Sequence, residues 1–243
     1  MQDFFTGIAE SFTKTFITDD RWLQLLQGLL VTLEITVFAA FLGIALGFLV
    51  AIVRSTFDMN LAGKKCRGFG DRVLKAINFI CNIYITVIRG TPVVIQLMIM
   101  YYIVFASSRN GIIAAILSFG INSGAYVAEI VRSGIMSIDK GQFEASRSLG
   151  FNYSSTMIYV IIPQAFKNIL PALGNEFIVL VKETSVAGYV ALQDLTYVGN
   201  LIRSRTYEAF FPLIAIALIY LVIVLFLTFL LKKLERRLRS SDH

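Results

Sequence analysis

Long apolar stretches alternate with short polar ones along this chain of 243 residues. Five stretches stay apolar for about 20 residues or more, the length that a helix needs to cross a hydrocarbon core of roughly 30 Å. These stretches are residues 22–53, 84–106, 111–135, 165–192 and 212–231. The pattern therefore predicts an all-α membrane protein with five transmembrane helices.

The basic residues are distributed unevenly among the polar segments between these stretches. Of the 22 Lys and Arg residues, fifteen lie on one side of the predicted membrane, counting Arg132 and Lys167 at the span ends on that side, five lie on the other, and Arg89 and Lys182 lie deeper within spans. Cytoplasmic loops collect Lys and Arg, so the N-terminus is predicted to be outside and the C-terminus inside. The net charge of +6 does not indicate nucleic-acid binding, because the basic residues are not interleaved with exposed aromatic ones.

The two ends of the chain complete the predicted domain organisation. Residues 1–20 place apolar side chains at helical spacing among acidic ones, which predicts an external amphipathic helix in the membrane interface. Residues 21–235 form the transmembrane domain, and residues 236–243 form a cytoplasmic tail. The first span repeats a small residue at every fourth position, namely Gly43, Gly47 and Ala51. This spacing is typical of membrane helices that pack closely together.

Composition excludes most enzyme chemistry. The chain is 56% hydrophobic and 16% charged, whereas about a quarter of the residues of a soluble domain are charged. The only histidine is His243, and Cys66 and Cys81 form no CxxC pair, so neither a zinc site nor histidine catalysis is predicted. No GxxxxGK[ST] or GxGxxG motif is present. We therefore predict no enzyme activity and no cofactor for this chain, and any energy would come from a partner protein.

The polar segment at residues 136–163 lies between the third and fourth spans, on the predicted cytoplasmic side. It contains Gly141-Gln142-Phe143-Glu144-Ala145-Ser146, then Gly150, then Val160-Ile161-Ile162-Pro163. This arrangement resembles the EAA motif of permease subunits of bacterial ABC importers. Three further stretches are similar to the polar amino acid branch of that family, the histidine, glutamine and arginine permeases. They begin at Ile88-Arg89-Gly90-Thr91-Pro92, Ser123-Gly124-Ala125-Tyr126 and Leu173-Gly174-Asn175-Glu176-Phe177.

The resemblance implies a fold, partners and a location. It implies the type I ABC importer permease fold in the bacterial inner membrane, with a polar amino acid as substrate. It also implies a second permease chain, identical or homologous, an extracytoplasmic solute-binding protein, and an ABC ATPase dimer that carries ATP and magnesium. Two features depart from the family pattern. Ser146 replaces the usual Ala, and the loop from Ser55 to Gly70 is longer than expected, which leaves the role of that loop open.

The same resemblance implies that residues 136–163 form the loop that couples the chain to the ATPase. The residues expected to do so are Gly141, Glu144, Ala145, Ser146, Gly150 and Pro163. Glu144 can pair with a basic partner residue, and the small side chains allow close approach. The alternative is an ordinary turn between helices, with Glu144 at a helix start and Gly150 at a helix end.

The fourth span is unusually polar for a membrane helix. A charge at the bilayer centre costs at least about 2.5 kcal/mol, so its charged side chains should face the interior of a bundle or a cavity. A zwitterion needs a carboxylate for its ammonium group and donors for its carboxylate. We therefore predict substrate contacts from Glu183, Thr184, Ser185 and Asn175, with Thr91 of the second span. The alternative is that Lys182 and Glu183 pair with neighbouring helices and only stabilise the bundle.

Two further alternatives concern charge and function. Arg89 and Glu129 lie at similar predicted depths on neighbouring spans, which favours a structural ion pair over substrate contact. Glu34 could line the pathway or pair with a neighbour. At the level of function, the rivals are a passive oligomeric channel and a permease for another small polar solute.

Overall fold

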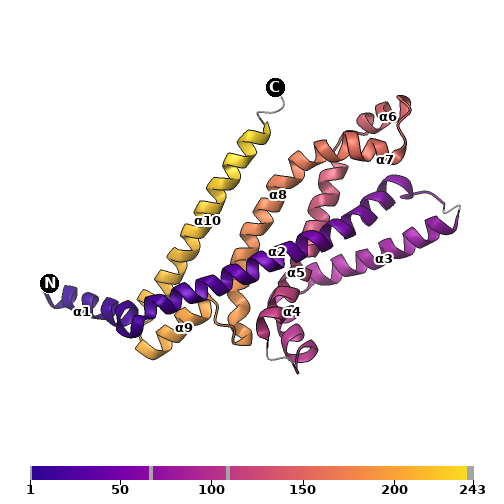
Figure 1. Ribbon diagram of the computed structural model, residues 1–243. Coiled ribbons are helices and arrows are strands. Elements are labelled where there is room, and N and C mark those ends of the chain that lie inside the picture. Colours follow the sequence, from indigo (N-terminus) through magenta and orange to yellow (C-terminus); the bar gives the residue numbers. More distant parts are fainter. Residues whose placement is uncertain (1, 66–67, 108–109, 240–243) are drawn as a thin grey trace. The chain divides into compact units, whose positions relative to one another are not determined.

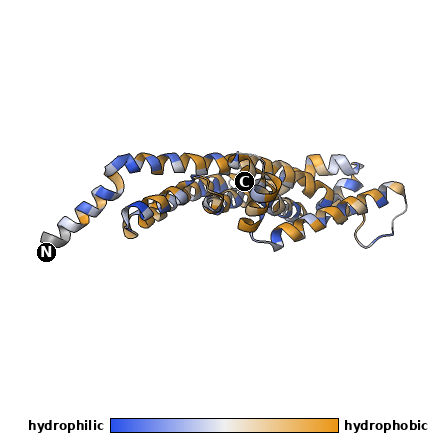
Figure 2. Ribbon diagram, turned by 90° about the horizontal axis from the view of Figure 1, so that it is seen from below, coloured by the Kyte–Doolittle hydropathy of each residue, from blue (hydrophilic) through white to orange (hydrophobic). Residues whose placement is uncertain are grey.

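The computed structural model describes residues 2–65, 68–107 and 110–239. Within these residues every regular element is a helix, and five helical stretches are long and apolar enough to cross a membrane (Figure 1). They are Thr6–Asn60, Phe69–Gly90, Gly111–Met136, Tyr153–Val190 and Phe210–Leu238. Figure 2 shows hydrophobic residues along most turns of these long helices. The prediction of an all-α membrane protein with five spans is confirmed. Cys66, His243 and the second half of the predicted tail, residues 240–243, lie outside the described residues.

The second span differs most from the predicted boundaries. We predicted it at residues 84–106, whereas α3 runs from Phe69 to Gly90 and ends there. Thr91 is extended (φ −120°, ψ 144°), because the following Pro92 disfavours the helical conformation of the residue before it. The chain then continues as the short α4 (Val93–Ile99) and a π-helical turn, η3 (Met100–Val104). One predicted apolar span is thus two elements joined at a break.

The predicted N-terminal helix is also divided. Residues 2–20 form α1 (Gln2–Phe12), η1 (Thr13–Ile17) and η2 (Thr18–Asp20). Asp19 and Asp20 have positive φ values of 57° and 51°, which interrupts regular helix. The Arg21 guanidinium closes this turn, since it donates to the Asp19 carboxylate at 2.9 Å and to the backbone carbonyl of Lys14. α2 (Arg21–Asn60) follows and takes in residues that we had assigned to the polar loop.

The chain divides into two compact units. The first unit consists of residues 1–39, 93–119 and 178–229, and the second consists of residues 40–92, 120–177 and 230–243. Long helices such as α2 contribute to both units, because each unit takes one part of their length.

The core of the first unit lies around α9 (Leu195–Thr206). Leu195, Val198 and Ile202 of α9 pack with Leu25 of α2 and Ile216 of α10 (Phe210–Arg239). Close approach is possible because α2 and α9 carry glycines at the contact. A Cβ on Gly28 would lie 3.0 Å from Val198, and one on Gly199 would lie 2.0 Å from Ile216.

The core of the second unit lies between α2, α5 (Gly111–Met136) and α8 (Ile162–Glu183). A Cβ on Gly43 would lie 3.0 Å from Ser123 of α5, and one on Gly47 would lie 2.4 Å from Val127. Ala51 continues this line and is fully buried. The close-packing role that the sequence predicted for these small residues is therefore confirmed. Further along α5, a Cβ on Gly134 would lie 2.3 Å from Ile169 of α8.

Candidate functional site

A short capped helix forms the middle of the predicted coupling segment. α6 spans Lys140–Ser148, and the Asp139 carboxylate accepts a hydrogen bond from the Gly141 N–H at 2.6 Å, which is the expected role of Asp before a first turn. The inward face of α6 is anchored by Phe143, whose ring lies 5.8 Å from that of Tyr153. Phe143 also packs against the buried core of the second unit. Phe143 thereby joins α6 to the packing of α2, α5 and α8.

The exit from α6 needs a glycine. Gly150 has φ +90°, and the Phe151 N–H donates to the Ser146 carbonyl at 3.1 Å, so the chain turns back on the end of the helix. A second short helix, α7 (Tyr153–Thr156), begins directly afterwards, where Asn152 accepts from the Ser155 N–H at 2.8 Å. Together these turns hold α6 outside the long helices.

The predicted coupling residues do not all face the same way. Gly141, Glu144, Ala145 and Gly150 are exposed. Ser146 is only 4% exposed, and its hydroxyl donates to the Gln142 carbonyl at 2.7 Å within the helix. Ser146 therefore supports α6 from inside, where a side chain larger than Ser would meet the core. Pro163 is exposed in the first turn of α8, after the π-helical turn η4 (Met157–Ile161), which accommodates its missing N–H.

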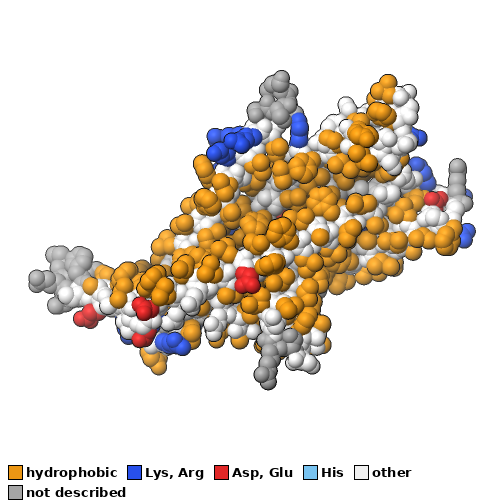
Figure 3. Space-filling model, in the orientation of Figure 1, with side chains coloured by type: hydrophobic (Ala, Val, Ile, Leu, Met, Phe, Trp, Pro, Cys, Tyr) orange, Lys and Arg blue, Asp and Glu red, His pale blue; other side chains and the backbone are white. Residues whose placement is uncertain are grey.

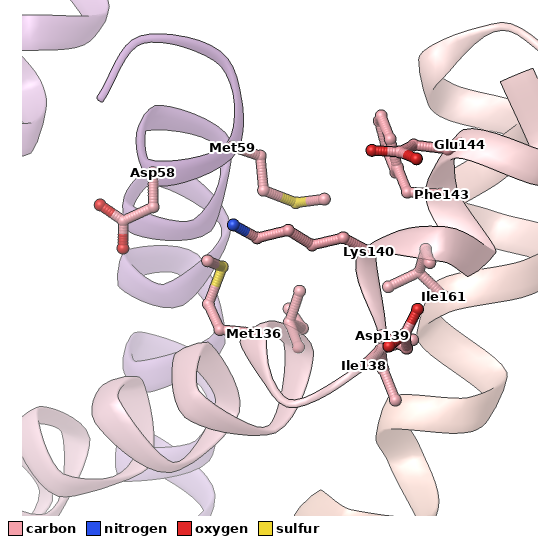
Figure 4. A pocket seen from close by; sticks show the side chains of 10 residues that line it. Asp58, Met59, Met136, Ile138, Asp139, Lys140, Phe143, Glu144 and Ile161 are labelled. Atoms are coloured by element: carbon pink, nitrogen blue, oxygen red, sulfur yellow. The ribbon is translucent and has the colours of Figure 1, made fainter. Parts of the chain in front are cut away.

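A cavity of about 300 Å³ lies beneath α6 in the second unit. Figure 4 shows Lys140 extending from α6 across it toward α2, with Met59 above and Met136 below. The lining is mostly apolar, with the charged groups of Asp58, Asp139, Lys140 and Glu144 around it. The cavity leaves open space between α6 and the end of α2.

A charge network lies beside this cavity at the ends of α2 and α5. Arg132 donates to Asp58 at 3.0 Å and to both carboxylate oxygens of Glu129, one of them at 3.1 Å. We had expected Glu129 to pair with Arg89. Instead, Glu129 pairs with Arg132, which is one turn further along α5. The guanidinium carbon of Arg89 lies 5.1 Å from the ring centroid of Tyr126, which is a cation–π contact.

The predicted substrate residues Glu183, Thr184 and Ser185 lie at a change of helix type in the first unit. Glu183 ends α8, and Thr184 begins the 3-10 helix η5 (Thr184–Val190). Thr184 is fully buried, and its hydroxyl donates to the Val181 carbonyl at 2.8 Å. Glu183 and Ser185 are partly exposed. Ser185 lines an open pocket of about 250 Å³ with Tyr189, Thr196, Tyr197 and Asn200.

The other two predicted substrate residues, Thr91 and Asn175, belong to the second unit, and both are exposed. The Thr91 hydroxyl donates to the Val87 carbonyl at 2.9 Å at the end of α3. Beside Asn175, Glu176 accepts a hydrogen bond from Ser123 of α5 at 2.9 Å, so this intramembrane acid contacts a neighbouring helix.

Three polar residues with clear structural positions were not singled out from the sequence. Asp58 completes the Arg132 network, Thr36 contacts Thr184, and Asp194 begins α9. Asp194 accepts from the N–H groups of Tyr197 at 3.0 Å and Thr196 at 3.1 Å. It is fully buried, and this burial raises its pKa to about 6. The sequence signal for Asp194 was its place before an amphipathic helix, which is typical of a helix cap.

Comparison with known proteins identifies the family. The profile described as "Binding-protein-dependent transport system inner membrane component" matches residues 70–240. The chain belongs to this family. It is 39% identical to the arginine transport system permease protein ArtQ of Bacillus subtilis (strain 168), over 90% of this chain and 94% of that protein. It is 36% identical to the glutamine transport system permease protein GlnP of Escherichia coli (strain K12), over 88% and 93%.

Chains of two solved ABC transporters have a similar fold. An amino acid ABC transporter crystallised with histidines has a chain 41% identical to this one, with a TM-score of 0.77 over 88% of this chain and 94% of that chain. The inward-facing MetNI methionine ABC transporter matches at 21% identity, with a TM-score of 0.75 over 91% and 99%, which bears on the fold alone. The predicted type I ABC importer permease fold is confirmed.

Proposed function

We propose that the chain is the permease subunit of an ATP-driven importer of polar amino acids in the bacterial inner membrane. The observation that carries the proposal is α6, a short capped helix that presents Glu144 and Ala145 to solvent while Phe143 packs into the core. A helix that is exposed on one side and packed on the other can bind a partner and transmit its movement to the core. The substrate class is supported by the relatives named for arginine and glutamine transport.

In this proposal the exposed side of α6 docks on a dimer of ABC ATPase subunits. Ala145 and Gly150 present no bulky side chain, so a partner surface can come close, and Glu144 offers a carboxylate to a basic residue. ATP and magnesium belong to the ATPase, and this chain binds no cofactor and makes no covalent bond. The contacts of Phe143 then carry the motion of α6 to α5 and α8.

The transport path is proposed to use the partly exposed polar groups at the end of α8. The Glu183 carboxylate binds the ammonium group of the substrate, and the Ser185 hydroxyl donates a hydrogen bond to the substrate carboxylate. Thr184 supports these two residues from the buried side, because its hydroxyl already has hydrogen-bond partners within the first unit. Thr91 and Asn175, both exposed in the second unit, are proposed as further substrate contacts.

The complete transporter is proposed to contain a second permease chain, identical or homologous, and an extracytoplasmic solute-binding protein. The N-terminus lies outside and the C-terminus inside, as the excess of Lys and Arg on one side predicts. Five spans are few for a transporter that normally has two related halves, so a second chain supplies the other half.

The test is uptake of labelled amino acids into proteoliposomes that contain the chain with its co-purified partners, with and without ATP on the ATPase side. We expect uptake of one group of polar amino acids only with ATP, and altered selectivity or a loss of at least about tenfold for Glu183→Gln. If uptake requires ATP but is unchanged by Glu183→Gln, the solute-binding protein selects the substrate. Flux without ATP would establish a passive channel and overturn the proposal.

A further inference from the structure

A basic and aromatic surface lies where the α2–α3 connection enters α3. Phe69 is the first residue of α3 and is 83% exposed. Arg72 and Lys75 follow within two turns and are exposed, as are Lys64 and Lys65 in the connection before the helix. We call these five residues the α3 basic surface. Lys64, Lys65 and Phe69 belong to the loop from Ser55 to Gly70, whose unusual length the function proposed above does not explain, and Arg72 and Lys75 follow it in α3.

The α3 basic surface contains four cations and no acidic residue. Within the described residues, none of its four cations forms an ion pair. The nearest acid along the chain, Asp71, is partly buried and has other interactions, and Asp58 of α2 is bound to Arg132. Four cationic groups therefore face outward with free donors.

α3 has a continuous exposed apolar side next to these cations. Residues spaced by three or four share one side of a helix, so Phe69, Val73, Ile77 and Ile80 form one continuous side. All four are exposed, and the same side continues to Ile83 and Val87. Figure 3 shows hydrophobic side chains covering much of the molecular surface that faces the viewer. In a membrane-spanning helix such a side contacts lipid tails.

Arg72 and Lys75 flank the end of this apolar side, and Phe69 lies at its very end. Lys and Arg at a membrane-facing helix end extend their charged groups to the lipid headgroups, while an aromatic ring occupies the interface. A docked soluble protein would account for the cations but not for the apolar side that runs from Phe69 into the span. The combination fits an anionic lipid.

We propose that the α3 basic surface binds the phosphate headgroups of anionic phospholipids in the leaflet beside the α2–α3 connection. The excess of Lys and Arg predicts that this is the cytoplasmic leaflet. Each basic side chain near an anionic membrane surface favours binding by about fivefold, so four together make a selective site. The long loop from Ser55 to Gly70 thus gains a function that does not depend on the transport proposal.

The test is a native mass spectrometry titration of the full chain, purified with its partner subunits and stripped of lipid, with phosphatidylglycerol or phosphatidylcholine. The test variant replaces Lys64, Lys65, Arg72 and Lys75 with Gln. The control replaces three exposed cations of the first unit that do not stand at the end of an exposed apolar helix side, Lys14, Arg203 and Arg205, with Gln. We expect the test variant to lose at least about tenfold in affinity for phosphatidylglycerol only, and the control to lose less than about twofold.

Two further measurements guard against a folding defect or another ligand. Phe69→Ser keeps every charge and is expected to weaken phosphatidylglycerol binding severalfold, and added salt is expected to weaken it in the wild type. Equal losses in the test and control variants would overturn the proposal, as would competition by soluble glycerol phosphate as strong as that by the lipid. It would also be overturned if the test variant lost the ATPase subunits while its lipid binding was unchanged. Because lipid binding is measured without transport, the outcome is independent of the uptake experiment.

Discussion

The hydroxyl oxygen of Thr36 lies 3.2 Å from that of Thr184, and both side chains are fully buried in the first unit. Thr36 belongs to α2, and Thr184 begins η5. One hydroxyl donates to the other, while the accepting hydroxyl donates within its own chain segment, from Thr36 to the Thr32 carbonyl at 2.7 Å or from Thr184 to the Val181 carbonyl at 2.8 Å. The contact joins the first membrane helix to the turn that carries Glu183 and Ser185. It explains how a change of helix type is held in place inside the membrane.

The contact predicts that Thr36→Val and Thr184→Val act on the same interaction. Each should destabilise the folded protein, and the double-mutant cycle should give a coupling energy of about 0.6 kcal/mol, the average for such bonds between membrane helices. Unfolding in detergent measures it. If Thr184 contacts substrate directly, Thr184→Val will change the apparent substrate affinity while Thr36→Val does not.

The two sides of α6 predict opposite effects for neighbouring residues. Ala145 is exposed, so Ala145→Leu should leave thermal stability unchanged within about 0.5 kcal/mol but block docking and lower ATP-driven uptake. Ser146 is buried, so Ser146→Leu should overfill the core and cost about 1–3 kcal/mol. Ser146→Ala is the matched control and should behave as the wild type. Full uptake by a stable Ala145→Leu protein would contradict the docking role of α6.

The sequence predicted the number of spans because apolar length alone decides whether a helix can cross a bilayer. It did not predict the start of α3. The first turns of α3 alternate exposed apolar residues such as Val73 and Ile77 with polar ones such as Asp71 and Asn78. One side of the helix packs on protein and the other is exposed, so no continuous apolar run marks its beginning.

For the candidate site, sequence patterns located the elements but not the direction of each side chain. Gly150 was considered as a helix end and does form the left-handed turn after α6, whereas the helix starts after Asp139 and not at Glu144. That Ser146 and Thr184 face inward depends on how each helix is rotated in its packing. The pairing of Glu129 with Arg132 follows a local spacing of three residues, which our comparison of depths between spans overlooked.

The Arg132 network predicts a large effect of removing one charge. Arg132→Met leaves Asp58 and Glu129 without their cation in a partly buried place and should cost about 2 kcal/mol. Arg132→Lys keeps the charge but not the forked geometry, so an intermediate loss is expected. Thermal unfolding in detergent compares them. The triple variant with Asp58→Asn and Glu129→Gln should recover stability relative to Arg132→Met, and no recovery would argue against the network.

The turn after α6 predicts a conformational effect at Gly150. No atom lies within 4 Å of a Cβ built there, so Gly150→Ala meets no steric clash, but its φ of +90° disfavours any side chain. Gly150→Ala should therefore cost about 1 kcal/mol, and Gly150→Asn should cost less because Asn tolerates positive φ. Limited proteolysis near Leu149, which is 80% exposed, reports the local opening. Equal protection of all three proteins would show that the turn is not strained.

Asp194 predicts how the stability of the first unit depends on pH. Its pKa is about 6 in the folded protein because burial disfavours the charged carboxylate, and an unfolded Asp titrates near 3.8. Between these values the folded protein holds a proton that the unfolded chain has lost, so stability falls as pH rises from about 4 to about 6 and then levels off. The change is at most about 1.4 kcal/mol for each unit of the pKa shift.

Asp194→Asn still offers an oxygen to the α9 N–H groups but cannot titrate, so its stability should stay flat over this range. Asp20→Asn, which changes an exposed acid, should keep the slope. Trp22, the only tryptophan and part of the same unit, allows unfolding to be followed by fluorescence at each pH. A slope that persists in Asp194→Asn would assign the titration to another group.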